Sequence, residues 1–490
     1  MVCAACLAGI GHRVRVEDVD ESHIVRLARG ETRFFEPGLE ALIGKGLASG
    51  RLSFHADAAE AIPPAELVFI CVPTSGDDDV PDLSGVVDAT IAVARYASDG
   101  AVLVNRTTAP VGTLRCVRSL LEEERAESIG VATNPEFFAE GTAVADFLAP
   151  YRILVGAWDE APVARLAEAY SPIVNDRLPP AVGPMVAGRS VDHPIPLLVT
   201  TPETAEVSKY AANAFLAVKI SFINEIAGIA DESGADVDDV AEALGLDPRI
   251  GPQFLRAGLG WGGSCFPRDI AVLNEVAETA RVRARLLSAA NEVNDEQRQW
   301  VVRKLRTHLR TLSGRRIGLL GLSFKPLTDD VRNAPALEIA AELVHAGAEV
   351  QAFDPLVTSL PYPFDGAIEL VQSPLAAAME ADALVLATEW DGFASLPLRD
   401  LRAVMRAPLL LDGRNCIDPV AARGAGFIYI GVGRGQGNVL SMIPSSGPSR
   451  RDPPDPPGGR RMPARPALVH ASRGQASVST VHPPVRDIFK

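Results

Sequence analysis

A cysteine and an aspartate stand four residues apart at the end of the glycine-rich segment GLGWGGSCFPRD (258–269). Pro267 predicts a helix start there, because proline is tolerated in the first helical turn. Cys265 would lie at that start, where backbone N–H groups and the positive helix end favour a thiolate. Asp269 would follow on the same helical face as an acid or base. The alternative is a buried structural cysteine in a turn.

Two carboxylates, Glu136 and Glu140, are also spaced by four, in NPEFFAEGTA (134–143). A carboxyl held against Phe137 and Phe138 would have a raised pKa, which suits a general base. Two carboxylates on a solvated helix would not. The sequence leaves both readings open.

Lys209 and Asn213 have the same spacing, on a predicted helix with few other polar residues. Buried polar groups require partners. A substrate oxyanion is one candidate partner, and an intrahelical or cross-domain hydrogen bond is the other.

Further polar residues stand where predicted strands end. Asp18 ends one such strand, where a carboxylate of a dinucleotide-binding fold accepts hydrogen bonds from ribose hydroxyls, although a turn or helix cap is the commoner role. CVPTS (71–75) and NRTTAPVGT (105–113) also end strands, at the sheet edge where ligands bind. Three basic residues near later strand ends could hold a diphosphate, namely Lys325, Arg332 and Arg414.

The elements that must position these residues alternate in type as far as about residue 196. Short apolar runs separated by amphipathic segments such as 86–97 predict a parallel sheet with helices on both faces. The predicted strands are 14–19, 67–72, 101–105 and 153–156.

A long helix over 203–233 is apolar nearly all round, which is typical of a buried helix at a domain or subunit interface. Residues 278–310 predict a further long, charged helix. A second strand–helix series begins at 315–324 and predicts a smaller doubly wound domain. Its later elements are a helix over 335–350, a strand end at 351–355, and strands over 381–388 and 408–415.

Composition narrows the function classes. The chain has 490 residues and a net charge of −15, which argues against a general nucleic-acid binder. Six scattered cysteines without metal spacing indicate reduced thiols in a cytoplasmic protein, with no metal site. No apolar stretch is expected to cross a membrane, and no secretory signal opens the sequence. From about residue 435 onward the chain is rich in Pro, Ser and Arg and is expected to be disordered.

Several motifs together resemble the nucleotide-sugar dehydrogenases (the UDP-glucose/GDP-mannose dehydrogenases), and most closely the UDP-glucose 6-dehydrogenase branch. GGSCFPRD looks like the family's nucleophile motif, and NPEFFAEGTAVADF, KYAANAFLAVKISFINE, DPRIG, GLSFKPLTDDVRNAPALEI and DGRN follow in the family's order. The run AFLAVKISFINE resembles the UDP-glucose branch more than the GDP-mannose or UDP-acetylmannosamine branches. The resemblance covers residue 2 to about residue 434.

The resemblance implies an α/β fold with two doubly wound Rossmann-like domains joined by a central helical dimerisation domain. The implied ranges are 1–196 for NAD binding, 197–312 for the central domain, 313–434 for UDP-sugar binding and 435–490 for a disordered tail. It implies a cytoplasmic homodimer that oxidises UDP-glucose to UDP-glucuronate in two NAD-dependent steps. Another nucleotide sugar is the alternative substrate.

The resemblance also assigns roles to residues. Cys265 would form a thiohemiacetal and then a thioester, which divides a four-electron oxidation into stages. Lys209 and Asn213 would stabilise oxyanions, Asp269 and Thr108 would position water and relay a proton, and Glu136 would support thioester hydrolysis. The implied cofactor residues are Asp18, His23, Thr74, Thr108, Glu140, Arg268 and Arg332. The implied substrate residues are Phe137, Lys209, Asn213, Phe254, Gly262, Lys325, Arg414 and, lent across the dimer, Arg249.

The chain departs from the family pattern at its start. MVCAACLAGIGH aligns with the helix that follows the family's GxGxxG turn, and Gly9 and Gly11 belong to the turn after that helix. That loop would supply the N–H groups for the pyrophosphate. We expect the chain as printed to bind NAD weakly. One explanation is a translation start placed too far downstream, and the alternative is an inactive remnant that binds sugar nucleotides.

Three smaller departures follow. Residues 175–196 resemble an insertion, expected as a surface loop. Arg268 replaces the family's lysine, which keeps the charge and alters the hydrogen-bond geometry. His23 stands where a basic residue usually contacts the ribose.

Overall fold

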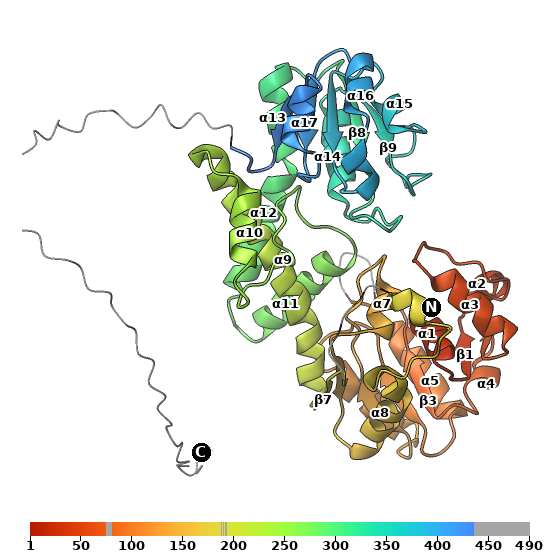
Figure 1. The fold of residues 1–490 in the computed structure, drawn as a ribbon. Helices are drawn as coiled ribbons and strands as arrows, with labels where there is room; N and C mark the ends of the chain where they lie inside the picture. Colours follow the sequence, from red (N-terminus) through yellow and green to blue (C-terminus); the bar gives the residue numbers. More distant parts are fainter. Residues whose placement is uncertain (75–80, 188, 190, 192–193, 436–490) are drawn as a thin grey trace, which may run out of the picture. The chain divides into compact units, whose positions relative to one another are not determined.

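The computed structural model describes residues 1–74, 81–187, 189, 191 and 194–435. They lie within one compact unit, Met1–Leu440. Figure 1 follows the chain from red to blue. The residues of the expected tail from 436 onward lie outside the described part, whereas the backbone N–H of Gly435 donates to Ala235 over 3.0 Å.

The N-terminal elements alternate as expected. They are α1 (Val2–Gly9), β1 (Val14–Glu17), α2 (Glu21–Leu27), α3 (Leu39–Ala48), β2 (Leu52–His55), α4 (Ala58–Ala61), β3 (Leu67–Ile70), α5 (Ser84–Tyr96), β4 (Val102–Asn105), α6 (Thr113–Glu123), β5 (Gly130–Thr133), α7 (Ala143–Leu148), β6 (Ile153–Gly156), α8 (Glu160–Val174), the 3₁₀ turn η2 (Gly183–Val186) and β7 (Leu197–Thr200). All four predicted strands are present, each within two residues of its expected ends.

These strands form two separate sheets. One has the order β3-β4-β5-β6-β7, and the other contains β1 and β2 alone. All pairs are parallel, as predicted, except β5 with β6, which is antiparallel. Strand β7 extends the larger sheet to Thr200, beyond the expected end of this domain at residue 196. In the described part of the chain, β1 and β3 do not pair.

The segment 175–196 was expected as a surface loop, and most of its described residues are exposed or half-buried. Two of them are anchored in the core. Val182 is fully buried and Ile195 is 2 % exposed, and both belong to the apolar cluster that also contains Leu42 of α3. A Cβ at Gly9 of α1 would lie 3.0 Å from Val182, so Gly9 and Val182 pack tightly. Burial of apolar surface therefore fixes the connection at Val182 and Ile195.

The central helices are α9 (Pro202–Ser233), α10 (Val237–Gly245), α11 (Cys265–Thr279), α12 (Arg285–Arg298) and α13 (Trp300–Leu309). α9 begins where the Thr201 hydroxyl accepts a hydrogen bond from the Thr204 N–H and ends at Gly234, whose φ of 77° is left-handed. The single long helix predicted over 278–310 was wrong. Arg281 has a φ of 57°, a left-handed conformation that ends an α-helix. The chain then turns back, and α12 packs on α9.

By length and composition, α9 is apolar enough to cross a membrane, which the sequence had not led us to expect. In the structure, however, it packs against α11, α12 and β6. Its buried side chains include Glu206, Lys209 and Asn213. The helix therefore belongs to a packed region that contains buried polar groups.

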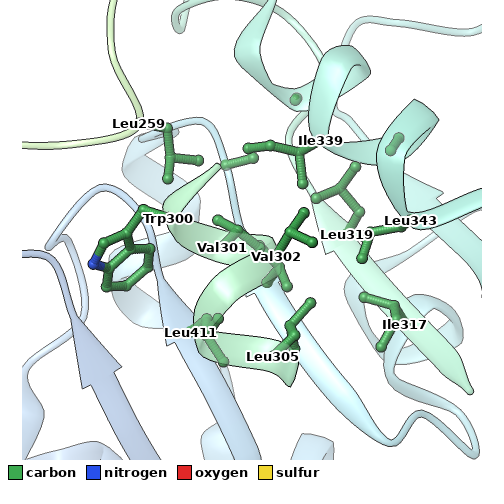
Figure 2. Packing of buried hydrophobic residues seen from close by; sticks show 14 of the residues in the cluster. Leu259, Trp300, Val301, Val302, Leu305, Ile317, Leu319, Ile339, Leu343 and Leu411 are labelled. Atoms are coloured by element: carbon green, nitrogen blue, oxygen red, sulfur yellow. The ribbon is translucent and has the colours of Figure 1, made fainter. Parts of the chain in front are cut away.

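The C-terminal elements form the second doubly wound sheet. They are β8 (Arg316–Leu320), α14 (Pro335–His345), β9 (Glu349–Phe353), β10 (Glu369–Leu370), α15 (Pro374–Ala378), β11 (Ala383–Leu386), η3 (Asp391–Ser395), α16 (Leu398–Val404), β12 (Leu409–Asp412), α17 (Pro419–Gly424) and β13 (Ile428–Gly431). The strands are all parallel, in the order β10-β9-β8-β11-β12-β13. Figure 2 shows α13 packed on this sheet, with Val302 and Leu305 near Ile317 and Leu319 of β8 and Leu343 of α14.

Candidate active site

Cys265 is the first residue of α11, and Ser264 precedes it as the helix cap. Pro267 therefore lies in the first turn, as predicted. The thiol is half-buried, and its sulfur lies 3.7 Å from the Ser264 hydroxyl. Burial raises the pKa of Cys265, while the cations of Lys209 and Arg268 act in the opposite direction. The expectation of a ready-made thiolate was wrong, because the loss of hydration outweighs those charges.

Asp269 lies one helical turn after Cys265 and is completely buried. One of its oxygens accepts two hydrogen bonds of 3.0 Å from the Arg268 guanidinium. The other accepts a 2.5 Å hydrogen bond from the side-chain amide of Asn213 on α9. These contacts satisfy both oxygens of the buried carboxyl group and fix the α9 face that carries Asn213 against the first turns of α11.

Lys209 lies one turn before Asn213 on α9, and its side chain is 3 % exposed. Its ammonium nitrogen lies 3.0 Å from Oε1 of Glu136 and 5.7 Å from the centre of the Phe137 ring. This ion pair joins two segments that are far apart in the sequence. Of the expected protein partners, it is therefore the cross-domain contact and not the intrahelical one. An ammonium beside a half-buried thiol can also stabilise an oxyanion that forms there.

Glu136 lies in the loop between β5 and α7, not on a helix, so the reading as a solvated helix pair was wrong. Its second oxygen accepts a 2.6 Å hydrogen bond from the Phe138 N–H. Burial acts to raise the pKa of Glu136, but the Lys209 ammonium, the Phe138 N–H and the Arg106 cation together hold it below its ordinary value. The expected raised pKa is therefore not found at this carboxyl, and Glu136 is ionised at neutral pH.

The raised value occurs at Glu140 instead. Burial and the neighbouring Asp330 raise the pKa of Glu140 to about 7, although Arg332 opposes them. The Arg332 guanidinium lies 3.7 Å from the Glu140 carboxylate and forms a two-pronged pair with Asp330. The Thr328 hydroxyl donates to Glu140 over 3.5 Å. A carboxyl with such a pKa can take up or release a proton near neutral pH.

The glycines before Cys265 allow a close backbone approach. A Cβ on Gly262 would lie 2.1 Å from the carbonyl oxygen of Asn333, and one on Gly263 would lie 2.8 Å from the Phe324 ring. Gly263 also has a φ of +80°. Its N–H donates to the Arg332 carbonyl over 3.1 Å. Glycine is thus required here for packing, which places the loop before Cys265 beside the segment after β8.

The predicted substrate residues are partly brought together. Arg414 donates to the Ala387 and Gly260 carbonyls, over 2.8 and 3.3 Å, and so joins the end of β12 to the glycine loop. The Phe254 ring is 41 % exposed and lies 6.5 Å from the ring of Phe266. Burial lowers the pKa of Lys325.

Arg249 remains apart from these groups. It is exposed and pairs with Asp247 of its own loop. The structure gives it no contact with Cys265 within this chain. A role in the site therefore requires a second copy of the chain.

The predicted cofactor residues lie at strand ends. Asp18 follows β1, where its carboxylate contacts His23 Nδ1 at 3.1 Å and accepts the Asp20 N–H at 2.9 Å. The buried Thr74 hydroxyl donates to the carbonyl of half-buried Thr108 over 2.8 Å. At the same sheet edge, Oδ1 of buried Asn105 has no hydrogen-bond partner among the described residues. An accepting carboxylate and an open acceptor fit the ribose and nicotinamide ends of a dinucleotide.

Helix α1 (Val2–Gly9) directly precedes β1, the strand that Asp18 follows. Among the described residues no group of three His, Cys, Asp or Glu side chains could hold a metal ion.

Sequence reasoning missed two buried residues that support the site. Arg106 directly follows β4 and contacts the loop that carries Glu136. Glu206 of α9 accepts hydrogen bonds from the N–H groups of Gly112 and Leu114, over 2.7 and 3.0 Å, and so fixes α9 to the loop that contains Thr108. The signal available was a charged residue in an otherwise apolar context, which usually has a specific partner.

Comparison with known proteins supports the family resemblance over 89 % of the chain. Models of the UDP-glucose/GDP-mannose dehydrogenase family match in three parts. The NAD binding domain matches residues 1–174, the central domain residues 203–296, and the UDP binding domain residues 318–419.

Individual relatives agree. A UDP-glucose 6-dehydrogenase of Pseudomonas aeruginosa is 39 % identical, with 89 % of this chain and 95 % of that protein covered. One of Rhizobium meliloti is also 39 % identical, over 89 % and 97 %. A solved UDP-glucose dehydrogenase of Pyrobaculum islandicum has a TM-score of 0.77 at 36 % identity, over 88 % and 94 %. A UDP-D-ManNAc dehydrogenase of Pyrococcus horikoshii has a TM-score of 0.75 at 26 % identity, over 89 % and 96 %.

Proposed function

Because the chain belongs to the UDP-glucose/GDP-mannose dehydrogenase family, we propose that it oxidises the C6 alcohol of UDP-glucose to the carboxylate of UDP-glucuronate. NAD is its cofactor and, when bound, accepts the hydride of each oxidation. The observation that carries the proposal is the meeting of α9 and α11. Asn213 of α9 donates to Asp269 of α11, and the charge of Lys209 on α9 acts on Cys265, the first residue of α11.

In the proposed sequence, the Cys265 sulfur attacks the aldehyde left by the first oxidation and forms a C–S bond. Lys209 stabilises the oxyanion of this thiohemiacetal. The second oxidation gives a thioester, and water then adds to its carbonyl carbon and releases the thiol. Since the pKa of Cys265 is raised by burial, its proton must leave as the C–S bond forms, and it passes through the relay to the former aldehyde oxygen, which becomes the hydroxyl of the thiohemiacetal. Asp269 and Thr108 would position the water and relay protons.

Glu136 would support the hydrolysis of the thioester. Its lowered pKa keeps it ionised, so it can accept a hydrogen bond from the attacking water. Asn213 would hold the substrate oxygen together with Lys209.

The remaining assignments follow from position. We propose that the cofactor is held by Asp18, His23, Thr74, Thr108, Glu140, Arg268 and Arg332. We propose that the sugar nucleotide is held by Phe137, Phe254, Gly262, Lys325 and Arg414. The proposed domain ranges are 1–196, 197–312 and 313–434, and the proposed location is the cytoplasm.

We also propose a homodimer formed through α9. Phe215, Phe222 and Ile229 are spaced by seven residues and are 64, 47 and 59 % exposed. Side chains at this spacing lie on one face of a helix, and such an apolar stripe is covered in stable proteins. A second copy would cover it and bring Arg249 to the partner's site.

The test is the stoichiometry of the reaction. Purified protein with UDP-glucose and NAD should yield two NADH for each UDP-glucuronate. Cys265→Ala should abolish net turnover, whereas Cys116→Ala, at an exposed cysteine outside the site, should retain it. Full activity in Cys265→Ala would sink the covalent mechanism, and turnover only with another nucleotide sugar would replace the substrate.

A second candidate is a sugar-nucleotide-binding protein without turnover. The observation in its favour is the separation of the two-stranded sheet β1–β2 from the sheet β3–β7. It predicts calorimetric binding of UDP-sugars with no NADH formed at high NAD. An in-frame strand and GxGxxG encoded upstream of Met1, together with NADH production by that longer chain, would instead support the dehydrogenase.

A further inference from the structure

Arg106 carries a buried positive charge that the proposed chemistry does not use. The residue is 8 % exposed and directly follows β4, where its backbone N–H donates to Ile70 over 3.0 Å. In the described part of the chain its guanidinium forms no ion pair with a carboxylate. A buried cation without such a partner lowers the stability of the fold unless neutral groups compensate for its lost hydration. Such a cation is therefore expected to have a specific role.

On one side the guanidinium contacts Asn134, two residues before Glu136. Its Nη1 donates to the Asn134 backbone carbonyl over 3.2 Å and also to the side-chain oxygen of Asn134. The Tyr170 hydroxyl donates to that same oxygen over 2.7 Å. The Asn134 amide in turn donates to the Leu154 carbonyl over 2.7 Å. The chain before Glu136 is therefore fixed to three different segments.

On the other side it contacts Phe138, two residues after Glu136. The guanidinium carbon lies 5.0 Å from the centre of the Phe138 ring and 5.6 Å from that of Phe147. Such cation–π contacts are stronger when they are desolvated. The backbone N–H of Phe138 is the group that donates to the Glu136 carboxylate over 2.6 Å.

We propose that Arg106 is the positioning residue for Glu136, since it contacts the chain on both sides of that carboxylate and holds it toward Lys209. This proposal rests on the proposed role of Glu136. The Arg106 charge also acts on the carboxylate through space, in the direction that keeps it ionised. A merely structural arginine would contribute to folding but would not set the state of Glu136.

The experiment compares three variants of the full chain. Arg106→Met keeps the aliphatic stem and removes the charge and the donors, while Arg106→Lys keeps the charge. Arg118→Met is the matched control, because Arg118 lies 5.2 Å over the Trp158 ring at the surface, away from Glu136.

The first readout does not depend on turnover. In hydrogen–deuterium exchange, the peptide covering 134–142 should exchange about tenfold faster in Arg106→Met, while α11 keeps its protection. Arg106→Lys should lie between, and Arg118→Met should match the parent. Unchanged exchange in Arg106→Met would overturn the proposal. If Arg106→Met does not fold, Tyr170→Phe, which removes one donor to Asn134 and keeps the charge, should give a smaller increase in the same peptide.

The second readout is kinetic. In Arg106→Met, kcat for UDP-glucose oxidation should fall by about 100-fold with little change in KM, the size of effect expected when a catalytic group is misplaced by about 1 Å. Intact-mass measurement should show the acyl adduct on Cys265 accumulating, because hydrolysis is the step affected. The acidic limb of the pH profile should move to higher pH, since loss of the Arg106 cation raises the pKa of Glu136. If kcat and KM both worsened and no acyl adduct accumulated on Cys265, the result would contradict the proposal. If the parent protein forms no NADH, the proposed function fails, and the exchange experiment alone decides the role of Arg106.

Discussion

The ammonium of Lys209 lies 3.0 Å from the carboxylate of Glu136, and both side chains are largely buried. The pair joins helix α9 to the loop after β5, and Asn213, one turn further along α9, joins the same helix to α11. Helix α9, which holds α11 through Asn213, is therefore also linked by an ion pair to the loop at the edge of the N-terminal sheet. Cys265, the proposed nucleophile, and Glu136, which is proposed to support hydrolysis, therefore both lie on segments that contact α9.

Removal of one partner of this pair should be costly. Lys209→Met should lower the free energy of unfolding by about 3–5 kcal/mol, because it leaves the Glu136 carboxylate buried without its main counter-charge. Urea unfolding at pH 7.5 measures this. The loss should be greater at high pH than at pH 5, since without Lys209 burial raises the pKa of Glu136 and protonation relieves the penalty.

The double variant Lys209→Met/Glu136→Gln separates stability from catalysis. It should recover most of the lost stability, because neither position of the former pair then carries an unpaired buried charge, and it should remain inactive, because both proposed catalytic groups are removed. Lys304→Met breaks a more exposed pair with Asp231 and should cost at most about 1 kcal/mol. Equal losses in Lys209→Met and Lys304→Met would show that the buried pair has no special weight.

The sequence singled out Lys209 and Glu136 as candidates but did not predict their pairing. Lys209 and Glu136 each stood out as a polar residue in apolar surroundings, yet no local pattern joins residues so far apart in the chain. The four-residue spacing of Glu136 and Glu140 suggested a helix, whereas the chain there is a loop held by Arg106. As a result, the raised pKa belongs to Glu140, which lies beside Asp330 of the C-terminal part.

The fold was predicted best where periodicity is local. Strands such as 153–156 were found because a short apolar run between turn residues is typical of a buried strand. The break after α11 depends on the left-handed conformation of Arg281, which a helix-forming composition does not reveal. The packing of 175–196 onto α1 and α3 likewise depends on tertiary contacts of Val182. Long-range packing decided each of the cases that the sequence did not predict.

The close approach at Gly262 makes a sharp prediction. Gly262→Ala should lower kcat/KM by at least about 100-fold, because the added Cβ would meet the Asn333 carbonyl at 2.1 Å and displace the loop before Cys265. Gly44→Ala is the control, in helix α3 with no atom near its Cβ, and should stabilise the protein by about 0.5–1 kcal/mol. UDP-glucose kinetics and thermal unfolding of both variants check this, and an active Gly262→Ala would contradict the packing argument.

Glu140 should make stability depend on pH. Its pKa is raised from 4.5 to about 7, so its stabilising contribution is present below about pH 4.5 and is lost as pH rises through about 7. Glu140→Gln removes that loss of stability. The Tm of the variant relative to the parent should therefore rise by about 2–4 °C between pH 5 and pH 8. Differential scanning calorimetry across this range is the measurement. Glu168→Gln, at an exposed position of α8, should follow the parent at every pH, and a Glu140→Gln variant that does the same would refute the prediction.

The apolar stripe of α9 should control assembly. Phe222→Glu places a charge at the centre of Phe215, Phe222 and Ile229, where burial against a second copy would leave it unpaired. The variant should therefore be monomeric in light scattering at concentrations where the parent is a dimer. Because Arg249 has only its own loop as partner within one chain, the monomer should also bind UDP-sugars more weakly. Val420→Glu, at a 75 % exposed position of α17, should remain dimeric, so a parent that is itself monomeric, or a dimeric Phe222→Glu, would exclude this face as the interface.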